Sequence, residues 1–157
     1  MRKQKGKLKI SNKARSKRLS SCGYYFKILG TWMDRKMDER LEPLGLSLNQ
    51  FAITMMLLEK DGLTQVEIGQ RVMLPPYATT RNIDKLESLG YLKRKRHESS
   101  RRSYRILLTD AGRDLAPALY QTTESVNELF LSPLREKQRA EFYKTLRILS
   151  SKLKVPT

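Results

Sequence analysis

Two short stretches hold most of the side chains in this sequence that could bind a charged ligand. Residues 1–18 contain nine lysines and arginines and no acid, and residues 93–105 contain seven basic residues against a single acid, Glu98. Together the two stretches carry fifteen of the sixteen net positive charges of the 157-residue chain. Guanidinium and ammonium groups at this density predict an extended polyanion as the partner.

Between these stretches the sequence predicts two short helices that meet at a tight turn. The first helix begins with a capping box, because the Thr64 side chain can accept from the amide of Glu67 while Glu67 reaches back. The turn is placed at residues 74–76, where two prolines cannot donate into a continuing helix but suit a first turn. The second helix is expected over residues 76–89. Three of its residues are expected to face inward: Thr79, Ile83 and Leu86.

The opposite side of this second helix presents side chains that can read a duplex: Pro76, Tyr77, Thr80, Arg81 and Lys85. Arg81 can make bidentate hydrogen bonds to guanine, Thr80 can bond a phosphate or a base, and Tyr77 can pack against a thymine methyl group or bond a phosphate. The helix is therefore predicted to lie in the major groove. Two alternatives stay open. For Tyr77, the alternative is a surface aromatic side chain that makes no contact. For Arg81, the alternative is a salt bridge with Asp84 or Glu87 along the helix.

Two strand-like segments follow, residues 91–97 and residues 103–108, and the polar residues 98–102 are expected to form the tip of a hairpin. Five basic residues of this predicted wing are candidate DNA ligands: Lys95, Arg96, Arg101, Arg102 and Arg105. The pair at the tip suits insertion into a narrow minor groove, whose potential is strongly negative, and the other three suit the flanking phosphates. The alternative is a solvated basic hairpin, or one that binds RNA by charge alone.

Helical segments with three- and four-residue apolar spacing flank the helix pair and the wing, over residues 20–42, 47–58, 109–130 and 132–153. Ser47 and Gln50 form a second capping-box candidate, and Thr109 is expected to cap a long helix that bends at Pro117. The predicted fold class is mainly α with a small β-hairpin wing (α+β). It is a winged helix-turn-helix with N- and C-terminal dimerisation helices.

The first and last of these helices carry apolar faces too wide for a small winged domain to cover, which predicts a homodimer. The residues expected at its interface are Tyr25, Leu29, Trp32, Phe130, Leu134, Phe142, Leu146 and Leu149. Two-fold symmetry would then place two recognition helices about 34 Å apart. Four segments are expected: a basic disordered arm (1–18), an N-terminal dimerisation helix (19–46), a winged DNA-binding domain (47–109) and C-terminal dimerisation helices (110–157).

Several functional classes are disfavoured by composition. With one cysteine, Cys22, and one histidine, His97, the chain can form no internal disulfide and no zinc site of the usual ligand count. No apolar run reaches the roughly 20 residues of a membrane span, so a cytoplasmic protein is expected. No phosphate loop or paired-carboxylate motif is present, so we expect neither an enzyme nor a cofactor. A basic RNA- or ribosome-associated protein remains the alternative to a DNA-binding regulator.

The order of motifs resembles the MarR family of bacterial regulators. The resemblance covers about residues 20–153 and is carried by Asp84-Lys85-Leu86-Glu87 with Gly90, the arginine pair 101–102, and Leu108-Thr109 with Gly112. The family commonly has an aspartate where this chain has Ser100, apolar residues at the positions of Thr79 and Asn82, and a polar helix start in place of Pro75-Pro76.

This resemblance implies a homodimeric repressor that binds a pseudo-palindromic double-stranded DNA operator. It also implies release by a small aromatic or phenolic ligand, or by oxidation. One branch of the family places a peroxide-sensing cysteine beside tyrosines, as Cys22 stands beside Tyr24 and Tyr25. The alternative, which we prefer from the sequence, is a free and partly buried thiol.

Overall fold

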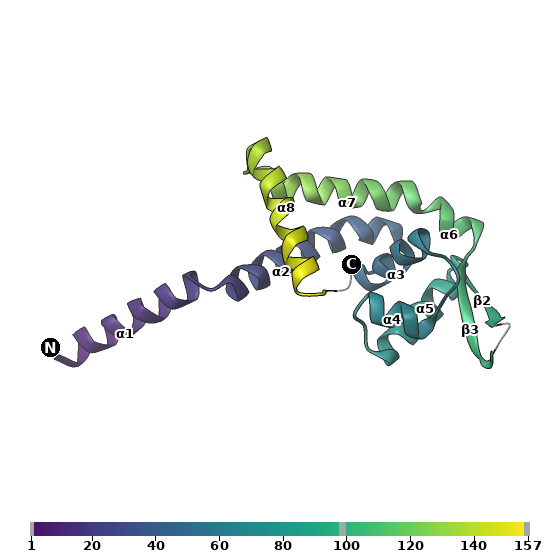
Figure 1. The fold of residues 1–157 in the computed structure, drawn as a ribbon, viewed down its shortest axis with the longest axis horizontal. Coiled ribbons are helices and arrows are strands. Elements are labelled where there is room, and N and C mark those ends of the chain that lie inside the picture. Colours follow the sequence, from purple (N-terminus) through teal and green to yellow (C-terminus); the bar gives the residue numbers. More distant parts are fainter. Residues whose placement is uncertain (1, 98–99, 156–157) are drawn as a thin grey trace. The chain divides into compact units, whose positions relative to one another are not determined.

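The computed structural model describes residues 2–97 and 100–155, and it divides into two compact units, residues 1–36 and residues 37–157. Each unit is described by itself. The described chain is mostly helical, with one small antiparallel sheet whose strand order is β1-β3-β2 (Figure 1). This agrees with the predicted class of a mainly α fold with a β-hairpin.

The first unit contains helix α1 (Arg2–Leu19) and most of helix α2 (Cys22–Leu41). Residues 11–21 are exposed along their whole length. The prediction of a disordered arm over residues 1–18 therefore differs from the structure, which gives residues 2–18 a helical backbone. The physical reason is local, because lysine, arginine, leucine and alanine are good helix formers and outnumber the weaker ones, Gly6, Ser11, Asn12 and Ser16.

The core of the second unit forms around helix α3 (Leu48–Glu59), which packs against helices α5 and α7. The predicted capping box is confirmed, because the Ser47 hydroxyl accepts from the amide of Gln50 while the Gln50 side chain accepts from the amide of Ser47. A 3-10 turn, η1 (Glu42–Leu44), separates α2 from α3, as Pro43 and Gly45 lead one to expect. Several apolar side chains are fully buried here: Leu41, Ile53, Leu57, Leu119 and Val126.

The predicted helix pair is present as α4 (Gln65–Arg71) and α5 (Pro76–Ser88). The capping box of Thr64 and Glu67 is confirmed, and the three residues expected to face inward are buried: Thr79, Ile83 and Leu86. The helices cross closely at Gly69, where an added Cβ would lie 2.8 Å from the Thr79 hydroxyl oxygen. Gly90 ends α5 with a φ of +77°, as a helix C-terminal glycine should.

The wing consists of β2 (Leu92–His97) and β3 (Ser100–Leu108), which project together as a hairpin (Figure 1). A two-residue strand that the sequence analysis missed, β1 (Leu63–Thr64), pairs with the other edge of β3. The predicted tip over residues 98–102 is partly wrong, because β3 begins at Ser100 and includes the arginine pair 101–102. Ser100 pairs with His97 across a register shift, which lets the strand start earlier. Residues 98–99 lie outside the described residues.

The C-terminal helices are α6 (Asp110–Asp114), α7 (Ala116–Leu131) and α8 (Glu136–Lys152). Thr109 caps α6, as predicted. The expected bend is instead a break, because Pro117 takes a first-turn position of α7, where its missing amide hydrogen is not needed. The last helix begins at Glu136 rather than at residue 132, because Arg135 and Gln138 form the capping arrangement that starts it.

Within the described residues no single helix is long and apolar enough to cross a bilayer, although one pair, Cys22–Leu44 with Leu48–Glu59, passes the length and composition test jointly while bent by 80°.

Candidate nucleic-acid interface

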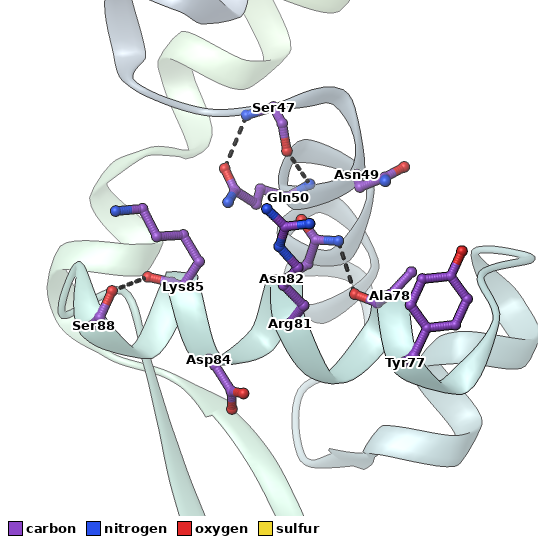
Figure 2. Close-up of a pocket in the computed structure, with 10 residues that line it drawn as sticks. All are labelled: Ser47, Asn49, Gln50, Tyr77, Ala78, Arg81, Asn82, Asp84, Lys85 and Ser88. Atoms are coloured by element: carbon purple, nitrogen blue, oxygen red, sulfur yellow. Dashed lines mark hydrogen bonds between the residues drawn. The ribbon is translucent and has the colours of Figure 1, made fainter.

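The outer face of α5 carries four of the five side chains predicted for the major groove. Pro76, Tyr77, Arg81 and Lys85 are exposed, and Tyr77 retains 77% of its accessible surface. A hollow of about 810 Å³ lies between this face and the start of α3. Figure 2 shows Tyr77, Arg81 and Lys85 around it, with Asn49 of α3 and Ser47, which caps α3, on the other side. The helix therefore offers an aromatic ring, a guanidinium and an ammonium group side by side.

Arg81 does not form the ion pair that was its alternative. Asp84 and Glu87 both bind Arg94 of β2, and no carboxylate in the described part of the chain bonds Arg81. Burial alone would lower the pKa of Arg94, but the hydrogen bond with Asp84 and the charge of Glu87 raise it above its ordinary value. The acids on α5 are thus neutralised from the wing, and the Arg81 guanidinium stays available for an external acceptor.

Thr80 is hydrogen-bonded within the chain, and its predicted contact with DNA stays a prediction. Its hydroxyl donates to the Pro76 carbonyl oxygen at 2.9 Å and accepts from the Gln65 side chain, and the residue is half-buried. A hydroxyl has one hydrogen to give, and this one is already given within the chain. Thr80 therefore joins α4 to α5 through Gln65, a residue that the sequence analysis did not single out.

The base of the wing is held by Asp61, which the sequence analysis also missed. One carboxylate oxygen of Asp61 accepts from the amides of Gly62 and Leu108, each at 3.0 Å, and the other pairs with Arg113. Arg105 donates to the Gly62 carbonyl oxygen at 2.7 Å. Arg105 was predicted to line phosphates, but in the structure its guanidinium first secures the turn before β1. Arg113 and Asp61 are 52 residues apart, and no local pattern links them.

The remaining wing residues differ in what the structure describes. Lys95 and Arg96 on β2 are exposed, as a phosphate-binding role requires. Arg101 and Arg102 lie on the backbone of β3, but their side chains fall outside the described residues. Their predicted insertion into the minor groove stays a prediction.

The Leu108-Thr109…Gly112 motif is a joint between the wing and α6. The Thr109 amide donates to the Tyr91 carbonyl oxygen at 3.0 Å, and its hydroxyl donates to the Gly90 carbonyl oxygen at 2.6 Å and accepts from the Gly112 amide at 3.1 Å. A Cβ at Gly112 would lie 2.1 Å from the Tyr91 carbonyl oxygen. Only glycine lets α6 approach the start of the wing this closely.

Glu67 has a pKa below its ordinary value. The main cause is the hydrogen bond from the Thr64 amide to the Glu67 carboxylate at 2.7 Å, followed by the bond from the Thr64 hydroxyl at 2.8 Å. Both bonds favour the ionised carboxylate. The ionised Glu67 carboxylate therefore strengthens the capping box that starts α4.

The residues predicted for a dimer interface divide between the two units. In the second unit, Phe130 and Phe142 pack on each other with ring centroids 6.2 Å apart, Leu134 and Leu146 are half-buried, and Leu149 is 42% exposed. In the first unit, Tyr25 and Leu29 are exposed and Trp32 is half-buried. None of the residues of α8 is buried.

Cys22 is exposed, so the preferred prediction of a partly buried thiol is wrong. Cys22 is the first residue of α2, and there the helix has not yet begun its apolar stripe. In the described residues no group of three or more histidine, cysteine, aspartate or glutamate side chains could hold a metal ion.

Two short helices crossed at a glycine, an exposed basic helix face and an adjoining two-stranded hairpin define a winged helix-turn-helix protein. The sequence model of the MarR family matches residues 44–103 of this chain. The HTH-type transcriptional repressor Rv2887 of Mycobacterium tuberculosis is 31% identical over 129 residues, which is 82% of this chain and 93% of that protein. The chain belongs to the MarR family.

Other relatives and solved structures agree. The HTH-type transcriptional regulator SarZ of Staphylococcus epidermidis is 28% identical over 82% of this chain and 85% of its own. The crystal structure of a MarR transcriptional regulator from Methanosarcina mazei Go1 superimposes with a TM-score of 0.79 at 30% identity, covering 85% of this chain and 96% of that one. The Mycobacterium tuberculosis MarR family protein Rv2887 in complex with salicylic acid gives a TM-score of 0.71 at 30% identity, covering 83% and 96%.

Proposed function

We propose that this protein is a sequence-specific DNA-binding transcriptional regulator that reads the major groove with α5. The observation that carries the proposal is the exposed set of Tyr77, Arg81 and Lys85; within the described residues no acid pairs with Arg81, because Arg94 occupies both nearby acids. An unpaired guanidinium on such a helix suits bidentate bonding to a guanine edge. The related Rv2887 has been solved in complex with DNA, which supports the same use of the fold here.

The regulator is proposed to act as a homodimer. On α8 the apolar Leu149 remains 42% exposed, and α2 exposes Tyr25 and Leu29. A second copy of the chain would cover such faces by two-fold symmetry. Two recognition helices about 34 Å apart would then match an inverted-repeat operator on one side of the duplex.

A repressor that a small aromatic acid releases is the finer form of this proposal. The relative at 31% identity is named a repressor, and the same relative has been solved with salicylic acid. Adding salicylate to the protein bound to its operator should weaken the complex, as a gel-shift titration would measure. Benzyl alcohol, which keeps the ring and lacks the carboxylate, is the matched control. If both compounds or neither act, an aromatic acid is not the effector.

An oxidant remains the second possible signal, because Cys22 is exposed. Mild peroxide treatment followed by a gel shift distinguishes the two signals. Release from the operator in the unchanged protein and not in a Cys22→Ser variant would support oxidation. Unchanged affinity in both proteins would dismiss it.

Selection of binding sites from random duplexes tests the core of the proposal. We expect an inverted repeat to be recovered, and Arg81→Ala to cost about 1–3 kcal/mol on that site and to relax the preference at one base pair. Lys144→Ala removes one positive charge from an exposed position on α8 and is the matched control. Equal binding of structured RNA and the selected duplex would favour an RNA- or ribosome-associated protein instead.

A further inference from the structure

We infer that α1 is a second DNA-binding element, which holds the phosphates of duplex lying outside the operator. This inference rests on the proposed function, because it takes DNA as the partner. It concerns a helix that lies outside the winged domain and that the readout of base edges does not use.

The first step is the charge of the helix. Residues 1–18 carry nine basic residues and no acid, so no residue of this segment can neutralise another. The described cations of α1 are all exposed: Lys13, Arg15, Lys17 and Arg18. At about 100° per residue, these four positions cover about 200° of the helix circumference, which is more than one side of the helix. The two walls of a groove provide anions on more than one side of such a helix.

The second step is the spacing. Lysines recur every four residues at positions 5, 9, 13 and 17. In a helix, like charges at this spacing lie next to each other and repel, so the free helix is destabilised and a polyanion would stabilise it. Successive lysines are separated by about 6 Å along a helix axis. Phosphates follow each DNA strand at about 3.4 Å along the duplex axis, so each lysine can meet roughly every second phosphate.

The third step is the absence of a competing apolar face. The large apolar residues within the helix are Leu8, Ile10 and Leu19, which do not recur at three- or four-residue spacing. A bilayer surface or a protein groove would gain little from such a helix. Its charge alone selects the partner, and duplex DNA is the polyanion that this protein is proposed to bind.

The junction between α1 and α2 stabilises the end of α1 and the start of α2 as separate helices. The Ser20 hydroxyl donates to the Lys17 carbonyl oxygen at 3.0 Å, and the Ser21 hydroxyl accepts from the Tyr24 amide at 3.3 Å. The Arg18 guanidinium lies over the Tyr24 ring, 5.1 Å from its centre. These contacts cap both helix ends at the break. At about 1.5 Å per residue, the 18 residues of α1 span about 27 Å, or roughly eight base pairs.

The test uses the full-length chain and a variant in which the four described cations, Lys13, Arg15, Lys17 and Arg18, are changed to glutamine. Glutamine keeps helix propensity, so charge is what changes. The matched control changes three exposed polar residues of the same helix to glutamine: Ser11, Asn12 and Ser16. Binding is measured from about 50 to 200 mM salt on two duplexes with the same selected operator. One duplex ends at the operator, and the other continues into random sequence.

The unchanged protein should bind the longer duplex more tightly, and this advantage should be smaller in the four-glutamine variant, which keeps the five basic residues before Lys13. The slope of log affinity against log salt on the longer duplex should become less steep by about 3 to 4 for each chain, at about 0.9 per lost phosphate contact. An unchanged slope, with operator preference intact, overturns the inference and leaves the proposed function standing.

Loss of structured-RNA binding in the four-glutamine variant, with duplex binding untouched, also overturns the inference and identifies RNA as the partner of α1. If the unchanged protein shows no operator preference, the proposed function fails. The salt slope on an arbitrary long duplex then still decides whether α1 binds DNA.

Discussion

Arg94 is a side chain that links the wing to α5. Its guanidinium binds Asp84 and Glu87 of α5, and its amide donates to Glu87 at 3.1 Å. These bonds position β2 against α5 and remove negative charge from the face that would approach DNA. Arg94 therefore forms ion pairs inside the protein although it belongs to the basic wing, whereas the nearby Arg96 is exposed to solvent.

Arg94→Ala should lower the free energy of unfolding by about 1 kcal/mol, because Asp84 and Glu87 lose partly exposed ion pairs with the guanidinium. It should also weaken DNA binding, since the two carboxylates would then repel the duplex and Asp84, three residues from Arg81, would compete for its guanidinium. Urea unfolding and gel shifts measure the two effects. Arg96→Ala is the matched control, for which the unfolding free energy should change by less than about 0.5 kcal/mol. Equal loss of stability in both variants would mean that Arg94 has no special role.

Gly112 is the second residue whose identity the structure explains. A Cβ there would lie 2.1 Å from the Tyr91 carbonyl oxygen, which is part of the joint with Thr109. Gly112→Ala should lower the free energy of unfolding by at least about 2 kcal/mol, because backbone atoms rather than a flexible side chain must move. Gly23→Ala, where the nearest atom would be 3.8 Å away, should leave stability unchanged or raise it slightly. A tolerated Gly112→Ala in thermal unfolding would contradict the joint.

At the scale of elements, α4 depends on the ionised capping box that starts it. The pKa of Glu67 lies below its ordinary value, so the unfolded chain binds a proton more readily than the folded chain. The stabilisation is therefore complete above the pKa of the unfolded state and is lost as the pH falls through the pKa of the folded state.

The unchanged protein should lose stability from about pH 5 to about pH 3 more steeply than a Glu67→Gln variant, which has no proton to gain at this position. Glutamine still serves in a capping box, so the variant should fold. Urea unfolding at several pH values measures the slope for each protein. Identical slopes would show that Glu67 does not contribute to the acid dependence.

The wing should contribute to DNA affinity mainly through its positive charge and less through recognition of particular bases. Arg101→Ala or Arg102→Ala should weaken binding to many sequences alike and lower the salt slope by about 1 for each lost phosphate contact. Gel shifts at low and high salt on the selected operator and on an unrelated duplex measure both effects. Unchanged affinity at both salt concentrations would count against a DNA-binding role for the wing.

Elements were predictable from sequence where the signal is local. The capping boxes at Ser47 and Thr64, the inward side of α5 and the glycine after its end each depend on residues within a few positions. Pairings across the chain were not predictable, because Asp61 meets Arg113 and Gln65 meets Thr80 only after the sheet and the helices have folded. For the same reason, Thr80 and Arg105 were assigned to DNA although the structure shows them bonded within the protein.

At the scale of the whole molecule, α2 and α8 each expose apolar side chains to solvent in a single chain, which is unfavourable unless another surface covers them. Tyr25, Leu29 and Leu149 each keep more than 40% of their accessible surface, and all three belong to the stripes that predict a dimer interface. A dimer would present two recognition helices, so affinity for an inverted repeat depends on pairing as well as on Arg81. Loss of the dimer should therefore reduce operator binding without changing a residue that contacts DNA.

Leu149→Glu tests this directly. Leu149 is 42% exposed in one chain, so the change should cost the folding of that chain little, but a carboxylate in a paired apolar face would be desolvated and unpaired. Sedimentation at micromolar concentration should show a dimer for the unchanged protein and a monomer for the variant. Operator affinity should fall at least tenfold, because one half-site is then bound alone. Lys144→Glu, also on α8 but away from the apolar stripe, is the control and should remain dimeric. A Leu149→Glu protein that stays dimeric and binds the operator normally would place the interface elsewhere.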